Sequence, residues 1–281
     1  MTYIDAIILG AIQGFTEFLP VSSSGHLIIA RKIFSLPLQG SLTFDAILQC
    51  ATVLAVVLYF AKDLWNIALS VIRYITGKVI SRTEKVYIWA IALGTIPAII
   101  FGLLLESAMD SVFRNVDLVA GALLGGSMLM WYAQKQSVVD RRKLIGDTDS
   151  PKGPLEENQA LTVKKGIAIG FFQSLALIPG VSRSGATISG GLLVGLSREE
   201  ATRFSFLLSV PILVGSGLKK LLEVNFATSG GMFGALMVGS GVSFVAGLLA
   251  IHYFIKYLKT HTLSVFIWYR VALAIALFIF L

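Results

Sequence analysis

Two short polar segments carry the side chains of this apolar chain that are best suited to chemistry. The first runs from Glu17 to His26 and offers a carboxylate, three serine hydroxyls and an imidazole around Pro20. A neighbouring base can activate a serine for attack on phosphorus, and an imidazole can take or return a proton, so these residue types suffice for phosphoryl transfer. Helix capping explains any single serine of the three equally well. The serines are Ser22, Ser23 and Ser24.

The second polar segment runs from Pro179 to Thr187 and contains one arginine among small residues and hydroxyls. Small residues such as Gly180 let the backbone approach a ligand, and N–H groups just before a helix N-terminus form a nest that suits phosphate. Arg183 adds a permanently charged fork that can bind two phosphate oxygens at once. The segment therefore predicts a phosphate-binding site, with a helix cap and a structural arginine as the weaker alternative.

Glu17 has two roles open to it. It can act as a general base, or it can hold a divalent cation that bridges phosphates, because Mg²⁺ in such sites is often held by one or two carboxylates and substrate oxygens. Gln13 lies one helical turn earlier and shares the face of Glu17. We expect Gln13 to orient the carboxylate or bind substrate, and a packing or inter-helix hydrogen-bonding role is equally consistent with its position.

The elements that must position these segments are membrane-spanning helices. The chain is 56% hydrophobic and 14% charged, whereas soluble domains carry about a quarter charged residues. Five apolar runs are long enough to cross a hydrocarbon core of about 30 Å, and a shorter run at 46–60 is expected to add a sixth span. The five runs are 88–105, 118–132, 204–218, 232–255 and 263–281.

The basic residues argue for membrane topology rather than nucleic-acid binding. The net charge is +7, but the lysines and arginines sit in short stretches between spans instead of along one soluble face. A water-soluble fold and a nucleic-acid partner are therefore not expected. The single cysteine, Cys50, excludes a disulfide or a cysteine-ligated metal site within one chain.

An internal repeat relates the two polar segments. Displacing the sequence by 160 residues aligns Gln13 with Gln173, Ser22 with Ser182, and Gly25 with Gly185, among other matches. Each copy contains two apolar pieces too short to span a bilayer, separated by proline, serine and glycine. Such breaks survive at membrane depth only where protein or water surrounds them. We therefore expect a re-entrant helix pair in each half.

The predicted fold is an all-α integral membrane protein with an inverted-topology repeat, built from two re-entrant helix pairs and six transmembrane helices. Three spans after the first pair put the second pair on the opposite face, so the two breaks can meet near the midplane, as in transporters with interrupted helices. The first repeat covers residues 1–134, a cytoplasmic loop covers 135–162, and the inverted second repeat covers 163–281.

The distribution of lysine and arginine supports this topology. Sixteen of these residues fall on the face that carries the long central loop, and five fall on the opposite face. The positive-inside rule then makes the central loop cytoplasmic and places both termini outside. Arg183 and Arg270 lie at other depths. Arg270 is interpreted as a snorkelling residue near a membrane interface.

Ionisable residues inside the membrane are the strongest functional signal. A charged group in an apolar span costs several kcal/mol, so Glu17, His26 and Arg183 each need a partner, a water-filled cavity or a function. Glu17 and His26 flank the first break, and Arg183 lies in the second. A meeting of the two breaks would bring all three together, which favours a functional site over a structural ion pair.

At these motifs the chain closely resembles the bacitracin-resistance type of undecaprenyl-diphosphate phosphatase, an integral membrane family that regenerates the carrier lipid for cell-wall synthesis. Gln13 and Glu17 match its signature of Glu or Gln followed four residues later by Glu. Residues 179–187 match the pattern of proline, glycine, any residue, serine, arginine, serine, two residues and threonine. The resemblance covers the whole chain. Glutamine at the first position counts against any mechanism that needs two carboxylates.

The resemblance implies hydrolysis of undecaprenyl diphosphate to undecaprenyl phosphate and inorganic phosphate on the outer side of the bacterial cytoplasmic membrane. It implies catalytic positions at Glu17, His26 and Arg183, with Ser23 as the proposed nucleophile and His26 as the alternative. It also implies Mg²⁺ or Ca²⁺, which Glu17 and substrate oxygens would hold. The implied substrate-binding residues are Gln13, Ser22, Ser24, Gly180, Ser182, Ser184 and Thr187.

Other functional classes stay open at this point. Inverted repeats with broken helices also form lipid flippases and secondary transporters, and an enzyme that also flips its lipid is compatible with the same site. A purely structural membrane scaffold would leave the two matched polar breaks unexplained. The expected partners are the lipid bilayer and a polyprenyl diphosphate, and a homodimer is one assembly that the sequence allows.

Overall fold

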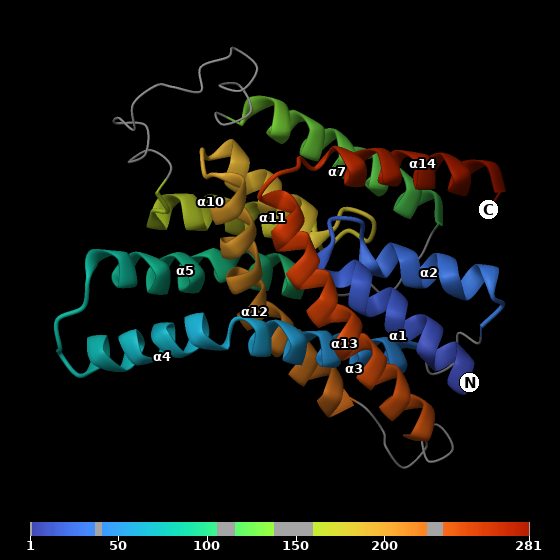
Figure 1. The fold of residues 1–281 in the computed structure, drawn as a ribbon, viewed down its shortest axis with the longest axis horizontal. Helices are drawn as coiled ribbons and strands as arrows, with labels where there is room; N and C mark the ends of the chain where they lie inside the picture. The colour runs from blue at the N-terminus through green and yellow to red at the C-terminus, as the bar shows by residue number, and fades with distance from the viewer. Residues whose placement is uncertain (1, 37–40, 106–115, 138–159, 224–232, 281) are drawn as a thin grey trace.

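The computed structural model describes residues 2–36, 41–105, 116–137, 160–223 and 233–280. These parts of the chain form eleven helices and no strand, as the predicted all-α class requires (Figure 1). Residues 138–159 of the predicted central loop lie outside them. The helices are α1 (Tyr3–Phe18), α2 (Ser23–Ile33), α3 (Ser41–Tyr59), α4 (Ala61–Ile75), α5 (Arg82–Leu104), α7 (Val116–Gln136), α10 (Val163–Leu175), α11 (Arg183–Leu193), α12 (Arg198–Glu223), α13 (Phe233–Leu258) and α14 (Ser264–Phe280).

Helices α5, α7, α12 and α13 are long and apolar enough to cross a membrane, each over a predicted span. Helix α3 reaches this standard only together with α4, from which it is bent by 77°, and α14 is a shorter apolar helix. The chain is therefore a multi-pass membrane protein with four such helices in its described residues, or five if α3 and α4 form one span.

Helix α4 was not predicted, because the sequence marks a span at 46–60 and no helix directly after it. Its polar residues recur every three or four positions, so they share one face of a helix. They also interrupt the apolar residues along the sequence, so that no continuous apolar run marks this helix. The polar face bonds to two neighbouring helices: Ser70 donates to Glu84 of α5 at 2.8 Å, and Asp63 pairs with Arg203 of α12. The polar residues of this face are Asp63, Asn66, Ser70 and Arg73.

Short helices flank both predicted breaks. The chain leaves α1 at Phe18 and begins α2 at Ser23, and it leaves α10 at Leu175 and begins α11 at Arg183. Proline removes a backbone donor and disfavours helical geometry in the residue before it. The breaks at Pro20 and Pro179 are therefore located as the sequence predicts.

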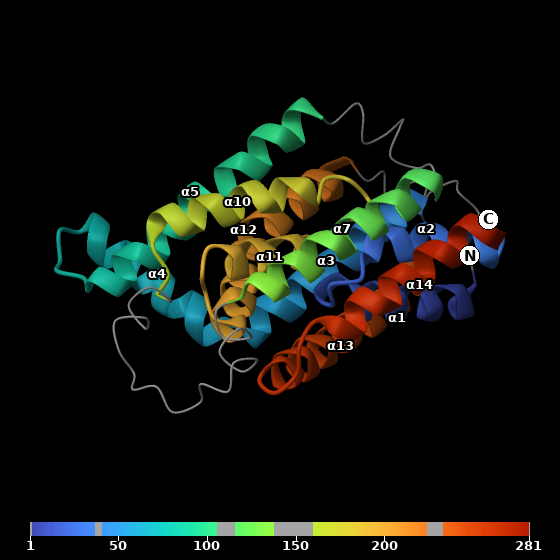
Figure 2. The same ribbon diagram turned by 90° about the horizontal axis from the view of Figure 1, so that it is seen from above.

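In each half of the chain, the short helix before the break packs against a long helix of the other half. Helix α1 lies along α13, and α10 lies along α5, as both views show (Figures 1 and 2). Small residues permit this approach: a Cβ added at Gly10 would lie 2.4 Å from the Gly239 carbonyl oxygen, and one at Gly170 would lie 2.1 Å from that of Gly94. Close backbone packing of this kind is typical of helix association in membranes. Helices α7 and α14 lie side by side and complete the scaffold.

Candidate active site

The two breaks have the same local conformation. Ser22 and Ser182 cap α2 and α11, with φ of 75° and 74°, and each side chain accepts a hydrogen bond from the backbone N–H three residues later. A non-glycine residue at positive φ is uncommon and costs of order 1–3 kcal/mol. The matched sequence positions thus carry a matched and strained backbone.

The two breaks also touch, as predicted. The N–H of Gly180 donates to Ser22 Oγ at 3.1 Å, and Ser184 Oγ donates to the Leu19 carbonyl at 3.1 Å. Gly180 has φ of 108°, and a Cβ there would lie 2.5 Å from the carbonyl oxygen of Val119. Glycine is therefore required both for the turn and for the close approach of the backbones.

Arg270 of α14 holds the two breaks together, and its interpretation as a snorkelling residue is wrong. Its side chain is fully buried, Nη1 donates to the Pro20 carbonyl at 3.1 Å, and Nη2 donates to the Gly180 carbonyl at 2.9 Å. It also donates to Ser127 and Leu123. A broken helix frees carbonyls that hydrocarbon cannot satisfy, and a buried guanidinium supplies the missing donors. Arg270 therefore has a structural task at the site.

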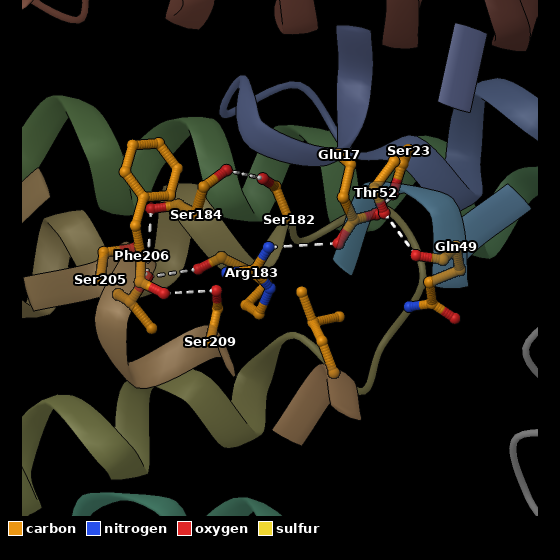
Figure 3. Close-up of polar contacts among 12 residues, drawn as sticks. Glu17, Ser23, Gln49, Thr52, Ser182, Arg183, Ser184, Ser205, Phe206 and Ser209 are labelled. Carbon is orange, nitrogen blue, oxygen red and sulfur yellow. Dashed lines mark hydrogen bonds and ion pairs between the residues drawn. The ribbon is translucent and has the colours of Figure 1, made fainter. Parts of the chain in front are cut away.

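Glu17 is the centre of the polar cluster where the breaks meet (Figure 3). Its Oε1 accepts from Arg183 Nη2 at 3.1 Å, and its Oε2 accepts from Gln13 Nε2 at 3.0 Å and from Ser23 Oγ at 2.7 Å. The Glu17 side chain is 6% exposed and the Arg183 side chain 11%. One Glu17 oxygen thus accepts from the Ser23 hydroxyl of α2, and the other accepts from the Arg183 guanidinium of α11.

Arg183 has two donors that no group in the described part of the chain uses. Its Nε and Nη1 are buried, and neither has a hydrogen-bond partner there. Leaving a buried charged donor unpaired costs more than the roughly 1–3 kcal/mol of a neutral group. An anionic ligand would satisfy both nitrogens, so the guanidinium is suited to bind phosphate oxygens while it pairs with Glu17.

His26 does not join this cluster, in contrast to the sequence expectation. Its Nδ1 lies 2.7 Å from the Ser22 carbonyl oxygen, and its Nε2 lies 2.6 Å from the Tyr269 hydroxyl. In the described part of the chain no hydrogen bond joins His26 to Glu17, Ser23 or Arg183. The carbonyl one helical turn before His26 draws the ring toward the cap of α2, and α14 supplies the partner on its other side.

The remaining predicted residues surround the cluster in different ways. Ser24 is exposed and lies 3.5 Å from Ser22 between their Oγ atoms, and the Oγ atoms of Ser182 and Ser184 are 3.2 Å apart. Thr187 is fully buried, and its hydroxyl donates to the Arg183 carbonyl at 2.8 Å. Its hydroxyl is thus occupied within the protein and supports α11.

Polar residues on α3 and α12 also border the cluster (Figure 3), and the sequence analysis missed them. Thr187 hydrogen-bonds to Ser205, and Ser205 and Ser209 are four residues apart on one face of α12. Gln49 and Thr52 are three residues apart on α3. Hydroxyls and amides at helical spacing within an apolar span were the available signal.

The Glu17 carboxylate alone offers little to a resident divalent cation. Its two oxygens accept from three donors, which leaves one of about four lone-pair sites free, whereas Mg²⁺ and Ca²⁺ take about six or more oxygen ligands. Among the described residues there is no group of three or more His, Cys, Asp or Glu side chains close enough to hold a metal ion.

Comparisons with known proteins identify a family that matches almost the whole chain. The family described as bacitracin resistance protein BacA matches residues 6–276. A protein of Thermobifida fusca named undecaprenyl-diphosphatase is 40% identical over 98% of this chain and 89% of its own length. A protein of the same name from Chlorobium phaeovibrioides is 39% identical over 100% of this chain and 98% of its own length. Undecaprenyl-diphosphatase 2 of Frankia casuarinae is 38% identical over 99% of this chain and 94% of its own length.

Proposed function

Because this chain belongs to the bacitracin resistance protein BacA family, we propose that it hydrolyses undecaprenyl diphosphate to undecaprenyl phosphate and inorganic phosphate. The observation that carries this proposal is the contact between Ser23 Oγ and Glu17 Oε2 at 2.7 Å, beside the unpartnered donors of Arg183. A serine paired with a base and an arginine suited to phosphate are the parts that phosphoryl transfer needs. A transporter or flippase gains no support from relatives that are named as diphosphatases.

The geometry supports Ser23 rather than His26 as the nucleophile. Ser23 Oγ would form a bond to the terminal phosphorus, the bond from that phosphorus to the bridging oxygen would break, and the hydroxyl proton would pass to Glu17. Undecaprenyl phosphate leaves. Water then attacks the phosphoserine, inorganic phosphate leaves, and the serine oxygen recovers the proton from Glu17. Arg183 holds the phosphoryl oxygens through both steps.

The Mg²⁺ or Ca²⁺ that the family resemblance implies is proposed to enter with the substrate. The diphosphate oxygens would supply most of its ligands, because the two Glu17 oxygens already accept three hydrogen bonds and leave one lone pair on Oε1. The cation is then part of the substrate complex, and Arg183 supplies the permanent positive charge of the protein.

The inverted repeat is proposed as the framework of this site, with two re-entrant pairs and six transmembrane helices. The matched φ values of Ser22 and Ser182 support it, as do the reciprocal packing of α1 on α13 and of α10 on α5. The charge distribution supports a site that opens to the outer side of the bacterial cytoplasmic membrane, with the first repeat at 1–134 and the second at 163–281.

The proposed orientation predicts the side on which the turn between α4 and α5 lies. A cysteine placed at Lys78, an exposed position, should react with a membrane-permeant thiol reagent in intact cells but not with an impermeant one, because this turn belongs to the basic, cytoplasmic face. Cys50 is first replaced by alanine so that the label reports one position. Labelling by the impermeant reagent from outside would reverse the topology.

The proposed substrate predicts selectivity for a lipid tail. An apolar groove of about 420 Å³ lies beside the second break, between the ends of α5 and α10, and its lining includes Phe101, Phe172 and Ile178. Burying even about 100 Å² of tail contributes about 2.5 kcal/mol, or roughly 70-fold. Purified protein in detergent should therefore have at least that much higher kcat/KM for a long polyprenyl diphosphate than for a five-carbon prenyl diphosphate.

The same assay tests the reaction itself. Phosphate release is measured with and without EDTA, and para-nitrophenyl phosphate serves as the soluble ester control. Equal kcat/KM for the ester and the long polyprenyl diphosphate would place the protein in a different phosphatase class. Absence of phosphate release from any diphosphate, by protein that is monodisperse, would refute the proposed function.

A further inference from the structure

The hydrogen bonds of His26 identify the nitrogen that carries its proton. A backbone carbonyl can only accept, so the contact of 2.7 Å between Nδ1 and the Ser22 oxygen requires a proton on Nδ1. The neutral ring then has its lone pair on Nε2, which lies 2.6 Å from the Tyr269 hydroxyl. Tyr269 therefore donates to His26. Both imidazole nitrogens are engaged, which leaves the Ser23 proton to Glu17.

The fold fixes Tyr269 firmly in this place. It precedes Arg270, whose guanidinium is tied to the carbonyls of both breaks, so the rotation of α14 about its axis is set by four hydrogen bonds. The rings of His26 and Tyr269 are also stacked, with centroids 5.6 Å apart and planes 9° apart. The second repeat has Ala186 at the position of His26. An imidazole therefore lies beside the first break and not at the matching position of the second.

We propose that Tyr269 serves the phosphatase through His26: it holds the ring in the Nδ1–H tautomer and passes a proton to Nε2, the basic nitrogen. The inference rests on the proposed function. In the second step Glu17 already holds the Ser23 proton, so a proton of the attacking water needs another base. Because the single lone pair of Nε2 accepts from Tyr269, the hydroxyl oxygen takes a proton from the water while its own proton passes to Nε2. The hydroxyl then accepts from the protonated ring, so it supports both states of His26.

Tyr269→Phe tests this assignment because it keeps the stacked ring and removes only the hydroxyl. We expect kcat for a polyprenyl diphosphate to fall about tenfold and KM to stay within about twofold, since His26 is misoriented but the phosphate donors are untouched. In a His26→Ala background the same change should alter kcat by less than about twofold, because Tyr269 acts through His26. The proposal is overturned if Tyr269→Phe lowers kcat equally with and without His26, or if it leaves kcat unchanged when His26 is present.

A second measurement reads the tautomer directly and needs no activity. The chain has three histidines, so ¹⁵N-histidine labelling and His26→Ala assign the signals of each ring. His26 should show a protonated Nδ1 and an unprotonated Nε2, and Tyr269→Phe should remove this bias. A wild-type His26 protonated on Nε2, or a tautomer unaffected by Tyr269→Phe, refutes the positioning role even if the enzyme is active.

The chain offers a matched control in a second tyrosine hydroxyl that contacts a histidine. Tyr59 Oη lies 3.5 Å from His252 Nδ1, between α3 and α13. Tyr59→Phe removes the same chemical group from the same kind of contact away from the breaks. It should leave kcat and the His26 signals unchanged. Failure of wild-type protein to release phosphate would count against the proposed function, and the tautomer measurement would still decide the role of Tyr269.

Discussion

Arg183→Lys should leave the helices intact and lower kcat/KM for a polyprenyl diphosphate at least tenfold. Lysine keeps the positive charge beside Glu17 but has no planar fork, so it cannot hold Glu17 and two phosphate oxygens in one fixed geometry. The nitrogens that would be lost are Nε and Nη1, which are buried and have no partner among the residues that the structure describes. Tenfold corresponds to about 1.4 kcal/mol of transition-state stabilisation, and kcat should carry most of the loss.

Arg270→Lys is the matched contrast for this prediction. Arg270 is also buried, but each of its three nitrogens donates to a protein group, and these groups include the carbonyls of Pro20 and Gly180. Lysine there would leave buried carbonyls without donors, at about 1–3 kcal/mol each. We therefore expect a lower thermal midpoint for Arg270→Lys and an unchanged one for Arg183→Lys, measured in the same detergent.

Arg183→Ala should reduce activity further, and its stability has to be measured alongside. Removing the arginine leaves Glu17 buried without its ion-pair partner, and breaking a buried pair in this way costs about 3–5 kcal/mol. Lysine is consequently the cleaner test. If Arg183→Lys is monodisperse, thermally stable and close to wild type in phosphate release, the guanidinium is not the phosphate ligand.

Much of the fold could be predicted because hydrocarbon leaves the sequence few choices. Apolar runs of span length at 88–105 and 232–255 became helices of span length, since a backbone in lipid must satisfy its own hydrogen bonds. The breaks at Pro20 and Pro179 follow from the same rule. Helix α4 escaped prediction because its polar residues occupy one face, so that no continuous apolar run marks it.

The candidate site was predictable only where its chemistry is local in sequence. The Gln13 and Glu17 pair follows from helical spacing, and the contact of Glu17 with Arg183 follows from the matched breaks. Tyr269 and Arg270 carry no such signal, because one is a common interfacial residue and the other resembles a snorkelling cation. Their role depends on which face of α14 points to the breaks. Packing against α7 and the hydrogen bonds of Arg270 decide this rotation. The direction of the His26 ring was unpredictable for the same reason.

Glu17→Gln should reduce kcat by at least about a hundredfold, the lower end of what a general base contributes. The amide has nearly the shape of the carboxylate and can still accept a hydrogen bond, but it cannot take the proton of Ser23. The change also leaves Arg183 beside a neutral group, so thermal stability is recorded for each variant. Phosphate release from a long polyprenyl diphosphate gives kcat, and binding of a non-hydrolysable diphosphonate shows whether the pocket still forms.

Ser23→Ala completes this prediction, because Ser23 and Glu17 should act as one unit. If the carboxylate serves to activate this serine across the 2.7 Å contact, the double variant should be no slower than the slower single variant, as for other nucleophile and base pairs. Ser24→Ala is the comparison and should lower kcat less than Ser23→Ala, since the Ser24 hydroxyl is exposed and lies beside Ser22 instead of Glu17. Losses that simply multiply in the double variant, or a Ser23→Ala enzyme with near wild-type kcat, would remove Ser23 from the role of nucleophile and leave Glu17 to activate water directly.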